Sequence, residues 1–434
     1  MIRILLALAL MGLSLPSLLA QTLEIDPVRG SASALPIAVV PFDYLGAQAA
    51  PDTDVAAVVR ADLDRSGSFR SLADRDLVER PIRQPDVNFG TWRLLKQDYL
   101  LIGRILDDPA GGFRTEFELF DVARQERMLG LALNGRPGNM RDLAHQIADQ
   151  VYEKILGVRG AFWTRIAYVT AVGSGQGTVY ALMIADADGH NPQTVVRSRE
   201  PLLSPAWSPD GRRLAYVSFE RGASSIYIQE IASGARELIA SFKGINGAPE
   251  FSPDGQKLAM ALSRTGNPEI HVMDLTSRQL TQLTQHWSID TEPRFTPDGQ
   301  RLVFTSDRGG KPQLYEVPVT GGEASRVTFG GQYNASPTIA PDGRIAMAQG
   351  EGNVYRIAIL DRRYGNSGEM RVISPGNLDE SPSFAPNGSM VLYAARENQR
   401  GVLYAVSADA RVRQRLILAD GDVREPAWSP FRQR

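Results

Sequence analysis

The sequence predicts an N-terminal α/β domain followed by an all-β six-bladed β-propeller. Three observations predict this fold: mixed helix and strand patterns in the first part of the chain, a short block that recurs after them, and a last block that completes the first repeat. The block has the consensus Pro-x-aromatic-Ser-Pro-Asp-Gly, and its copies start 44 or 45 residues apart. A period of this length is typical of one supersecondary unit stacked many times. The first prolines of the blocks, here called the marker prolines, are Pro205, Pro249, Pro293, Pro337, Pro382 and Pro426.

Residues 1–20 have the pattern of a secretory signal peptide. Arg3 supplies a positive charge, an apolar stretch follows, and the small residue Ala20 stands before Gln21 at the expected cleavage point. The apolar stretch is shorter than the roughly 20 residues that a membrane-spanning helix needs. We therefore expect a soluble exported protein whose mature chain begins at Gln21.

Residues 21–34 form a short segment between the signal peptide and the first predicted domain. The segment begins with a β-prone stretch and continues with a proline, a glycine and other small residues. Two interpretations stay open. It is either a frayed terminus, since chain termini are commonly disordered, or an arm that docks a partner.

Residues 35–157 are predicted to form the α/β domain, because strand and helix patterns are mixed there. Helices are expected over residues 53–65 and 139–156, the second with an apolar face. Strands are expected, the last two as a hairpin, over residues 35–42, 99–106, 114–120 and 127–133. The glycine-flanked stretch 157–160 is the expected join to the next domain.

Residues 161–434 are predicted to form the propeller. In each copy a short strand runs into the Ser-Pro-Asp-Gly turn and further strands follow, which gives four strands in about 44 residues, the unit of a propeller blade. In such a turn proline presets φ, aspartate accepts from its own backbone and glycine tolerates positive φ. The repeated aspartates therefore predict turns, and not catalysis, at Asp210, Asp254, Asp298 and Asp342, with Asn387 in the fifth copy.

The strand count predicts six blades, closed by pairing of the two ends of the propeller. The last block, 426–430, is a first strand with nothing after it, whereas residues 163–197 supply strands two to four with no first strand before them. Together they complete one blade and leave no unpaired inner edge.

Composition and motifs exclude several classes of function. The chain has 47 basic and 49 acidic residues, so it lacks the basic excess of a nucleic-acid-binding protein. It has no cysteine, and its four histidines lack metal-ligand spacing. Phosphate-loop motifs are absent, and the stretch 173–177 lacks the spacing of a nucleophile elbow. We expect neither an enzyme nor a cofactor.

The residues before the marker prolines are expected to ring one mouth of the central channel, because the loop that enters strand one lies on a single face of the disc. They are Ser204, Ala248, Glu292, Ser336, Ser381 and Glu425. Nearby Asp290, Asp379, Glu380 and Asp422 are expected to make this face acidic. An acidic mouth suits a partner loop with basic or amide groups, or a bound cation. A solvated rim without a partner is the alternative, and whether a metal ion binds stays open.

Together, the signal peptide, the strand Pro36–Phe42, the six blades and the last block resemble the TolB family, the periplasmic component of the Tol-Pal system. The resemblance spans essentially the whole chain. It implies a non-enzymatic periplasmic adaptor, monomeric by itself and peripheral to the outer membrane. Such a protein binds the lipoprotein Pal at the propeller mouth and the C-terminal domain of TolA through its mature N-terminus, and it supports outer-membrane integrity and constriction at cell division.

The resemblance also implies site residues. The Pal-binding loops correspond to Asn246, Gly247, Ala248, Thr291 and Glu292, with Ser204, Ser336 and Ser381 at the same mouth. The TolA-binding arm, which the family suggests can fold back on its own protein or be released, corresponds to Thr22, Leu23, Glu24, Ile25 and Asp26. One departure is Ile245, where the family can place a histidine. The rival functions are a propeller-containing peptidase-like hydrolase and a small-ligand sensor.

Overall fold

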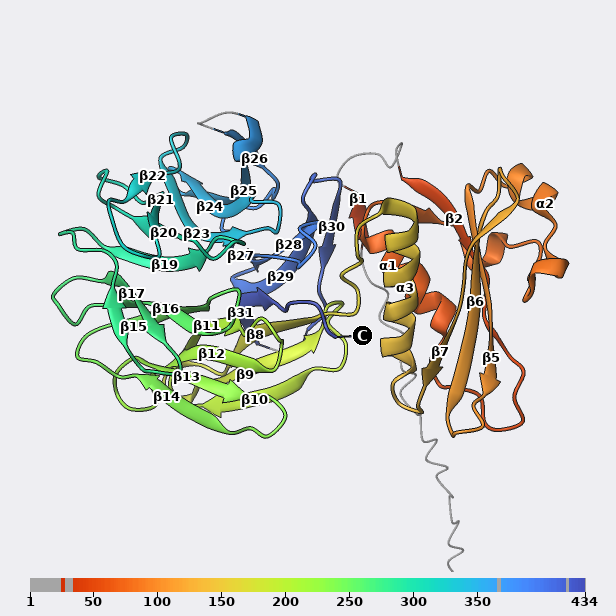
Figure 1. Cartoon of the computed structure of the whole chain (residues 1–434), viewed down its shortest axis with the longest axis horizontal. Helices are drawn as coiled ribbons and strands as arrows, with labels where there is room; N and C mark the ends of the chain where they lie inside the picture. Colours follow the sequence, from red (N-terminus) through yellow and green to blue (C-terminus); the bar gives the residue numbers. More distant parts are fainter. Residues whose placement is uncertain (1–24, 28–33, 365–367, 419–420, 434) are drawn as a thin grey trace, which may run out of the picture.

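Two domains lie side by side along the long axis of the molecule (Figure 1). The computed structural model describes residues 25–27, 34–364, 368–418 and 421–433. The expected signal peptide, its cleavage point at Ala20 and Gln21, and the arm residues Thr22, Leu23 and Glu24 lie outside the described residues. Within the described ranges, no helix is long and apolar enough to cross a membrane.

The α/β domain is built on a sheet with the strand order β4-β2-β5-β6-β7, and β3 pairs with the far part of β5. Strands β2, β4 and β5 are parallel, whereas β6 and β7 form the predicted antiparallel hairpin. The strand bounds are β2 (Leu35–Val39), β3 (Asp43–Tyr44), β4 (Phe69–Ser71), β5 (Tyr99–Asp107), β6 (Phe113–Asp121) and β7 (Glu126–Gly135).

Helices cover both faces of this sheet. The predicted helices α1 (Val55–Arg65) and α3 (Met140–Leu156) pack on one face, and the apolar residues Leu143, Ile147 and Val151 of α3 are buried there. The short helix α2 (Phe89–Leu94) buries Trp92 against the other face. This helix was not predicted, because six residues are too few to show a helical period.

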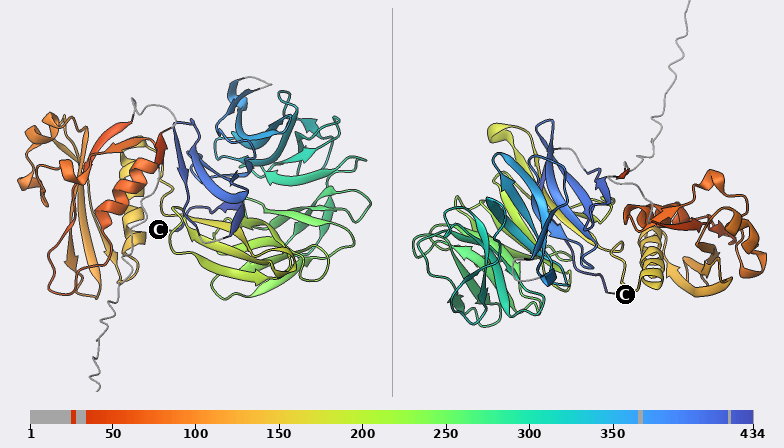
Figure 2. Two further views of the ribbon diagram at one scale, coloured as in Figure 1. Left: turned by 180° about the vertical axis from the view of Figure 1, so that it is seen from behind. Right: turned by 90° about the horizontal axis from the view of Figure 1, so that it is seen from above.

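The propeller has six four-stranded blades around a central channel (Figures 1 and 2), as predicted. Blade 1 contains β31 (Asp422–Trp428), β8 (Arg165–Val172), β9 (Val179–Asp186) and β10 (Gln193–Ser198). Blade 2 contains β11 (Leu202–Trp207), β12 (Arg213–Ser218), β13 (Ser225–Glu230) and β14 (Arg236–Ala240). Blade 3 contains β15 (Asn246–Phe251), β16 (Lys257–Leu262), β17 (Glu269–Asp274) and β18 (Leu280–Gln282).

The remaining blades repeat this plan, each with its inner strand first. Blade 4 contains β19 (Asp290–Phe295), β20 (Arg301–Ser306), β21 (Gln313–Pro318) and β22 (Ser325–Arg326). Blade 5 contains β23 (Tyr333–Ile339), β24 (Ile345–Glu351), β25 (Val354–Asp361) and β26 (Glu369–Val372). Blade 6 contains β27 (Glu380–Phe384), β28 (Met390–Glu397), β29 (Arg400–Ser407) and β30 (Val412–Arg415).

The ring closes between the two ends of the propeller segment. Strand β31 pairs antiparallel with β8, which places Trp428 opposite Ile166 and Asp422 opposite Ala171. The indole Nε1 of Trp428 also donates to Thr164 Oγ1 at 2.8 Å. The closure predicted from the strand count is therefore confirmed.

The Ser-Pro-Asp-Gly blocks form the turns between first and second strands. In blade 2, Asp210 Oδ1 accepts from the backbone N–H of Arg212 at 3.0 Å, and Gly211 has a φ of 68°. The other repeated aspartates accept from the N–H two residues further on, and Asn387 does so with its amide oxygen. These side chains build turns, as predicted.

A short piece of the arm adds a fifth strand to blade 6. Strand β1 (Ile25–Pro27) pairs antiparallel with β30, with Ile25 opposite Gln414 and Pro27 opposite Val412. It lies in the region between the propeller and the α/β domain (Figure 1). The described part of the arm is thus paired with its own protein.

The α/β domain packs against the face of the propeller that carries the strand-one-to-two turns, at blades 1 and 6. Helix α3 faces the propeller (Figure 2). The amide Nδ2 of Asn387 donates to the carbonyl of Arg159 at 3.0 Å, and Arg432 binds Asp142 of α3 with both terminal nitrogens at 2.8 and 3.0 Å. The opposite face, which carries the loops into the inner strands, is left open.

Candidate protein-binding site at the propeller mouth

The six residues before the marker prolines share one unusual backbone conformation. All have a left-handed φ, from 47° at Ala248 to 55° at Glu292 and Glu425. Each also sits in a β-bulge, where the register between the inner strand and its neighbour shifts. A non-glycine residue in this region costs on the order of 1 kcal/mol or more. The same strain at six equivalent places bends every inner strand at the same level and forms the mouth.

Hydrogen bonds join neighbouring members of this ring. The carboxylate of Glu292 in blade 4 accepts from the N–H and the hydroxyl of Ser336 in blade 5, at 2.8 and 2.7 Å, and from Thr305 Oγ1 at 2.8 Å. In the same way, Glu425 of blade 1 accepts from the N–H of Ser204 in blade 2 at 3.2 Å. Two of the rim carboxylates therefore hold adjacent blades together.

The rim carboxylates also influence one another. Burial raises the pKa of Glu425, and the nearby carboxylates of Glu380 and Glu292 raise it further, while the N–H of Ser204 and the guanidinium of Arg424 act in the opposite direction. The acidity expected at the mouth is thus provided by glutamates that lie close enough to repel each other.

Two aspartates that were expected to add to this acidity do not reach the surface. Asp290 and Asp379 are buried. Asp290 Oδ2 accepts from the guanidinium of Arg308 at 2.6 Å, and Asp379 Oδ2 accepts from Ser374 Oγ at 2.5 Å and from the N–H of Gly376 at 3.0 Å. That part of the prediction is wrong, because both carboxylates satisfy donors inside the loops.

Asn246 also has a different role from the one predicted. It is fully buried, at 0% exposure. Its Oδ1 accepts from the N–H of Phe242 at 2.9 Å, and its Nδ2 donates to the carbonyls of Phe242 and Ser224 at 2.8 and 3.0 Å. The prediction that Asn246 contacts a partner is wrong: it fixes the loop that carries Ile245. The other predicted rim residues, Gly247, Ala248, Thr291, Glu292, Ser204, Ser336 and Ser381, are half-buried at the mouth.

A set of exposed apolar side chains, here called the apolar crown, lies at the mouth on four of the six blades. Sequence reasoning missed all of its members except Ile245. Its members lie in the loops that lead into the inner strands of blades 3 to 6, and they range from 48% to 79% exposed. They are Ile245, Trp287, Ile289, Phe329 and Leu378. Exposed apolar side chains that gather on one face mark interaction surfaces. A signal was available, since three of them stand four residues before a marker proline.

The loops hold these side chains outward by their backbones. The N–H of Ile245 donates to Ser263 Oγ at 2.7 Å, and the N–H of Ile289 donates to Asp307 Oδ1 at 2.9 Å. With the backbone fixed, the apolar side chains do not fold into the loop. Ile245 and Ile289 are therefore carried by preformed backbone.

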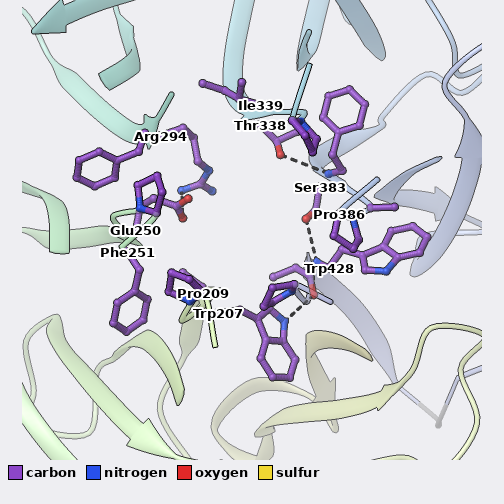
Figure 3. A pocket seen from close by; sticks show the side chains of 18 of the residues that line it. Trp207, Pro209, Glu250, Phe251, Arg294, Thr338, Ile339, Ser383, Pro386 and Trp428 are labelled. Carbon is purple, nitrogen blue, oxygen red and sulfur yellow. Dashed lines mark hydrogen bonds and ion pairs between the residues drawn. The ribbon is translucent and has the colours of Figure 1, made fainter. Parts of the chain in front are cut away.

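The half of the channel beyond the marker prolines is a pocket of about 350 Å³ (Figure 3). Its walls are tied across blades: Glu250 pairs with Arg294 at 3.4 Å, Trp207 Nε1 donates to the carbonyl of Ala427 at 3.0 Å, and the N–H of Trp428 donates to Ser383 Oγ at 2.9 Å. Burial raises the pKa of Glu250 and Arg294 lowers it. These contacts tie neighbouring blades together around the pocket.

Two family models match this chain. The TolB amino-terminal domain matches residues 23–128, and the TolB beta propeller domain matches residues 152–432. The chain belongs to the TolB family. It is 68% identical over 413 residues to the Tol-Pal system protein TolB of Xanthomonas campestris pv. campestris (strain B100), which covers 95% of this chain and 94% of that protein.

Two further relatives agree. The Tol-Pal system protein TolB of Xanthomonas oryzae pv. oryzae (strain PXO99A) is 67% identical over 433 residues, covering 99% of this chain and 98% of that protein. The crystal structure of TolB from Acinetobacter baumannii superimposes with a TM-score of 0.85 at 42% identity, covering 94% of this chain and all of that one. This TolB-family chain is therefore a non-enzymatic component of the Tol-Pal system, with partners inside that system.

Proposed function

We propose that this chain is an exported periplasmic adaptor that binds Pal at the propeller mouth and the C-terminal domain of TolA through its mature N-terminus. In this role it supports outer-membrane integrity and constriction at cell division. The observation that carries the proposal for the mouth is the apolar crown beside the acidic rim, on the face that the α/β domain leaves open.

The crown has the composition of a protein-binding surface. Tryptophan is enriched among the residues that dominate binding energy at interfaces, and phenylalanine is enriched in interfaces generally. Trp287 and Phe329 are 79% and 59% exposed. Carboxylates around such anchors accelerate encounter with a basic partner and fix its orientation. The expected ligand surface is an apolar projection bordered by basic or amide groups.

Truncating the most exposed anchor tests the mouth. Trp287→Ala is expected to weaken Pal binding about 30-fold, since loss of such an anchor costs roughly 2 kcal/mol. The measurement is calorimetric titration with purified Pal. Leu94→Ala is the matched control, because Leu94 is 85% exposed on the α/β domain. Unchanged affinity in the Trp287 variant would place Pal elsewhere.

Glu292 needs a conservative change. Glu292→Arg would break the hydrogen bonds to Ser336. A loss of Pal binding in that variant could then result either from the changed charge or from a disturbed fold. Glu292→Gln keeps an acceptor oxygen for Ser336 and removes the charge. It is expected to slow association with Pal and to reduce the salt dependence of the on-rate, measured by surface plasmon resonance. An on-rate equal to that of the unaltered protein would rule out electrostatic guidance by this carboxylate.

The arm is proposed to bind TolA as an added strand. In support, Ile25–Pro27 is extended and pairs with the edge strand β30 through its backbone, and a partner with an open sheet edge offers the same backbone groups. Deletion of residues 22–27 is expected to abolish TolA capture in a pull-down and to leave the Pal titration unchanged. Capture of TolA by the truncated protein would contradict this role.

A further inference from the structure

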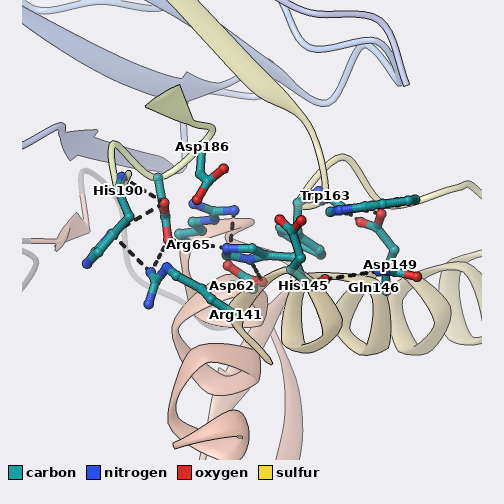
Figure 4. Close-up of polar contacts among 12 residues, drawn as sticks. Asp62, Arg65, Arg141, His145, Gln146, Asp149, Trp163, Asp186 and His190 are labelled. Atoms are coloured by element: carbon teal, nitrogen blue, oxygen red, sulfur yellow. Dashed lines mark hydrogen bonds and ion pairs between the residues drawn. The ribbon is translucent and has the colours of Figure 1, made fainter. Parts of the chain in front are cut away.

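A cluster of charged side chains lies between the α/β domain and blade 1 (Figure 4). Helix α1 contributes Asp62 and Arg65, and helix α3 contributes Arg141 and His145. The end of β9 contributes Asp186, and the turn between β9 and β10 contributes Asp188 and His190. The central three groups, Asp62, His145 and Asp188, are at most 6% exposed. The cluster therefore belongs to the interior of the contact between the domains.

His145 stands between a carboxylate of its own domain and one of the propeller. Its Nδ1 lies 2.6 Å from Asp62 Oδ2, and its Nε2 lies 3.7 Å from Asp188 Oδ2. Within the described ranges, Nε2 has no hydrogen-bond partner. A neutral ring that donates from Nδ1 to Asp62 turns a lone pair toward Asp188, which is repulsive. A protonated ring turns an N–H toward Asp188 instead and forms an ion pair across the contact.

The ring of His145 stands between two carboxylates that each bind one guanidinium: Arg65 binds Asp62 at 3.0 Å and Arg141 binds Asp188. Asp186 is partnered apart from them, since it accepts from Asn191 Nδ2 at 2.6 Å and lies near the charge of Arg165. A proton on His145 adds a positive charge between Asp62 and Asp188. The oxygens and nitrogens of Asp62, His145 and Asp188 lie within 4.8 Å of one another, but guanidiniums already bind both carboxylates, so the site suits a proton better than a divalent cation.

The other charged groups of α3 near this cluster are bound elsewhere. Asp142 pairs with Arg432, and Asp149 Oδ1 accepts from the N–H of Phe162 at 2.8 Å. The ring of His190 lies 3.3 Å from Asp188 Oδ1, and its side chain is half exposed. His145 is thus the buried group of the cluster whose second ring nitrogen, Nε2, gains a hydrogen-bond partner only when it is protonated.

The direction of the pKa shifts agrees with this geometry. Burial lowers the pKa of His145, but the carboxylates of Asp62 and Asp188 outweigh burial and the repulsion from Arg65, so the pKa is raised. Burial raises the pKa of Asp188, but His190, His145, Arg65 and Arg141 outweigh it and hold this pKa well below its usual range. Asp188 therefore stays ionised wherever His145 titrates.

We propose that His145 is a proton-operated latch, which holds the α/β domain to blade 1 more tightly when its ring is protonated. Asp62 stays beside His145 if the domains part, whereas Asp188 leaves with the propeller, so the ion pair to Asp188 exists only in the docked state. The ion pair stabilises docking fully at a pH below the ordinary titration range of histidine. This stabilisation is lost as the pH rises through the raised pKa that His145 has in the docked state. Alkaline medium releases it.

The titration of His145 tests the contact directly. The chain has four histidines, so NMR of histidine-labelled protein resolves each ring, and His145→Gln assigns the signal. Asp188→Asn is expected to lower the titration midpoint of His145 by about one unit, a tenfold loss of proton affinity. Asp210→Asn, in a turn of blade 2, is the matched control and should leave it unchanged. An unchanged midpoint in Asp188→Asn would overturn the latch.

Domain separation provides the second measurement. Because the chain has no cysteine, Leu94→Cys and Thr276→Cys place one dye on each domain for single-molecule energy transfer. An Asp149→Asn background removes another group that titrates near pH 6. The parted fraction is expected to rise up to about tenfold from pH 6 to 8.5, and His145→Gln should flatten this rise while His190→Gln preserves it. An equal rise with His145→Gln would overturn the proposal.

Discussion

The two faces of the propeller use buried and half-buried carboxylates in opposite ways. At the contact with the α/β domain, Asp62 and Asp188 are each bound by a guanidinium and closed off from water. At the mouth, Glu292 and Glu425 accept from hydroxyl and backbone groups and stand beside an exposed apolar crown. Balanced charge marks a contact already made inside the chain, whereas acidity next to exposed apolar groups marks a surface available to another protein.

The largest expected effect comes from removing the strand on which both faces depend. Deletion of residues 425–434 unpairs β8 and removes the bond from Trp428 to Thr164. The melting temperature is expected to fall by roughly 10 °C or more, because blade 1 loses its inner strand and exposes an edge. Calorimetry measures it, with deletion of residues 433–434 as the control. An unchanged melting temperature would mean that closure contributes nothing to stability.

A smaller effect separates loop support from partner contact at the mouth. Asn246→Ala removes the acceptor of the Phe242 N–H and the donor to the carbonyls of Ser224, Phe242 and Gly244. Stability should fall by about 1–3 kcal/mol, and Pal binding should weaken because Ile245 loses its fixed position. Urea unfolding and the Pal titration measure the two effects, with Gln256→Ala, an exposed amide of the same blade, as the control. Weakened Pal binding without a loss of stability would instead indicate that Asn246 contacts Pal directly.

The smallest expected effect concerns the join between the two regions. Burial raises the pKa of Asp149 to about 6, against the backbone N–H groups of Phe162 and Trp163, which lower it. Because the pKa of Asp149 is raised by folding, its protonated form stabilises the fold fully at a pH below its pKa in the unfolded chain. This stabilisation is lost as the pH rises through about 6. Above that pH an ionised carboxylate is buried at a cost.

Asp149→Asn keeps the acceptor for Phe162 and removes this cost. The variant is expected to be more stable than the unaltered protein by about 1–2 kcal/mol at pH 8 and nearly equal to it at about pH 3, below the ordinary value of 3.8 for this carboxyl group. Urea unfolding followed by tryptophan fluorescence gives both values. A stability difference that is the same at the two pH values would show that Asp149 is not the titrating group.

Local signals carried most of the fold prediction. The Ser-Pro-Asp-Gly turns depend on contacts within a few residues, as at Asp210 and Gly211, so their sequence is enough to place them. The strand alternation between the turns and the unmatched first strand at 426–430 then led to six blades and their closure. Helix α2 was not predicted, because its stability comes from Trp92 packing on the sheet and not from a helical period.

Whether a polar side chain faces water was much less predictable. Asn246, Asp290 and Asp379 each stand three residues before a marker proline, and Glu292 stands one residue before; the loops bury the first three and leave Glu292 at the rim. The difference arises because donors from distant residues, such as Ser224 and Arg308, enter the loops and satisfy the buried groups. Because these donors are distant in the sequence, the residues around each buried group do not reveal them.

The sequence by itself determined the period, the turns, the number of blades and the ring of residues before the marker prolines, because each depends on short-range backbone chemistry. Only the tertiary structure decided which loop side chains form the apolar crown and which charges meet between the domains. Asp62, His145 and Asp188 come from two helices and a propeller turn, and their titration depends on burial and on distances that exist only after the domains have packed.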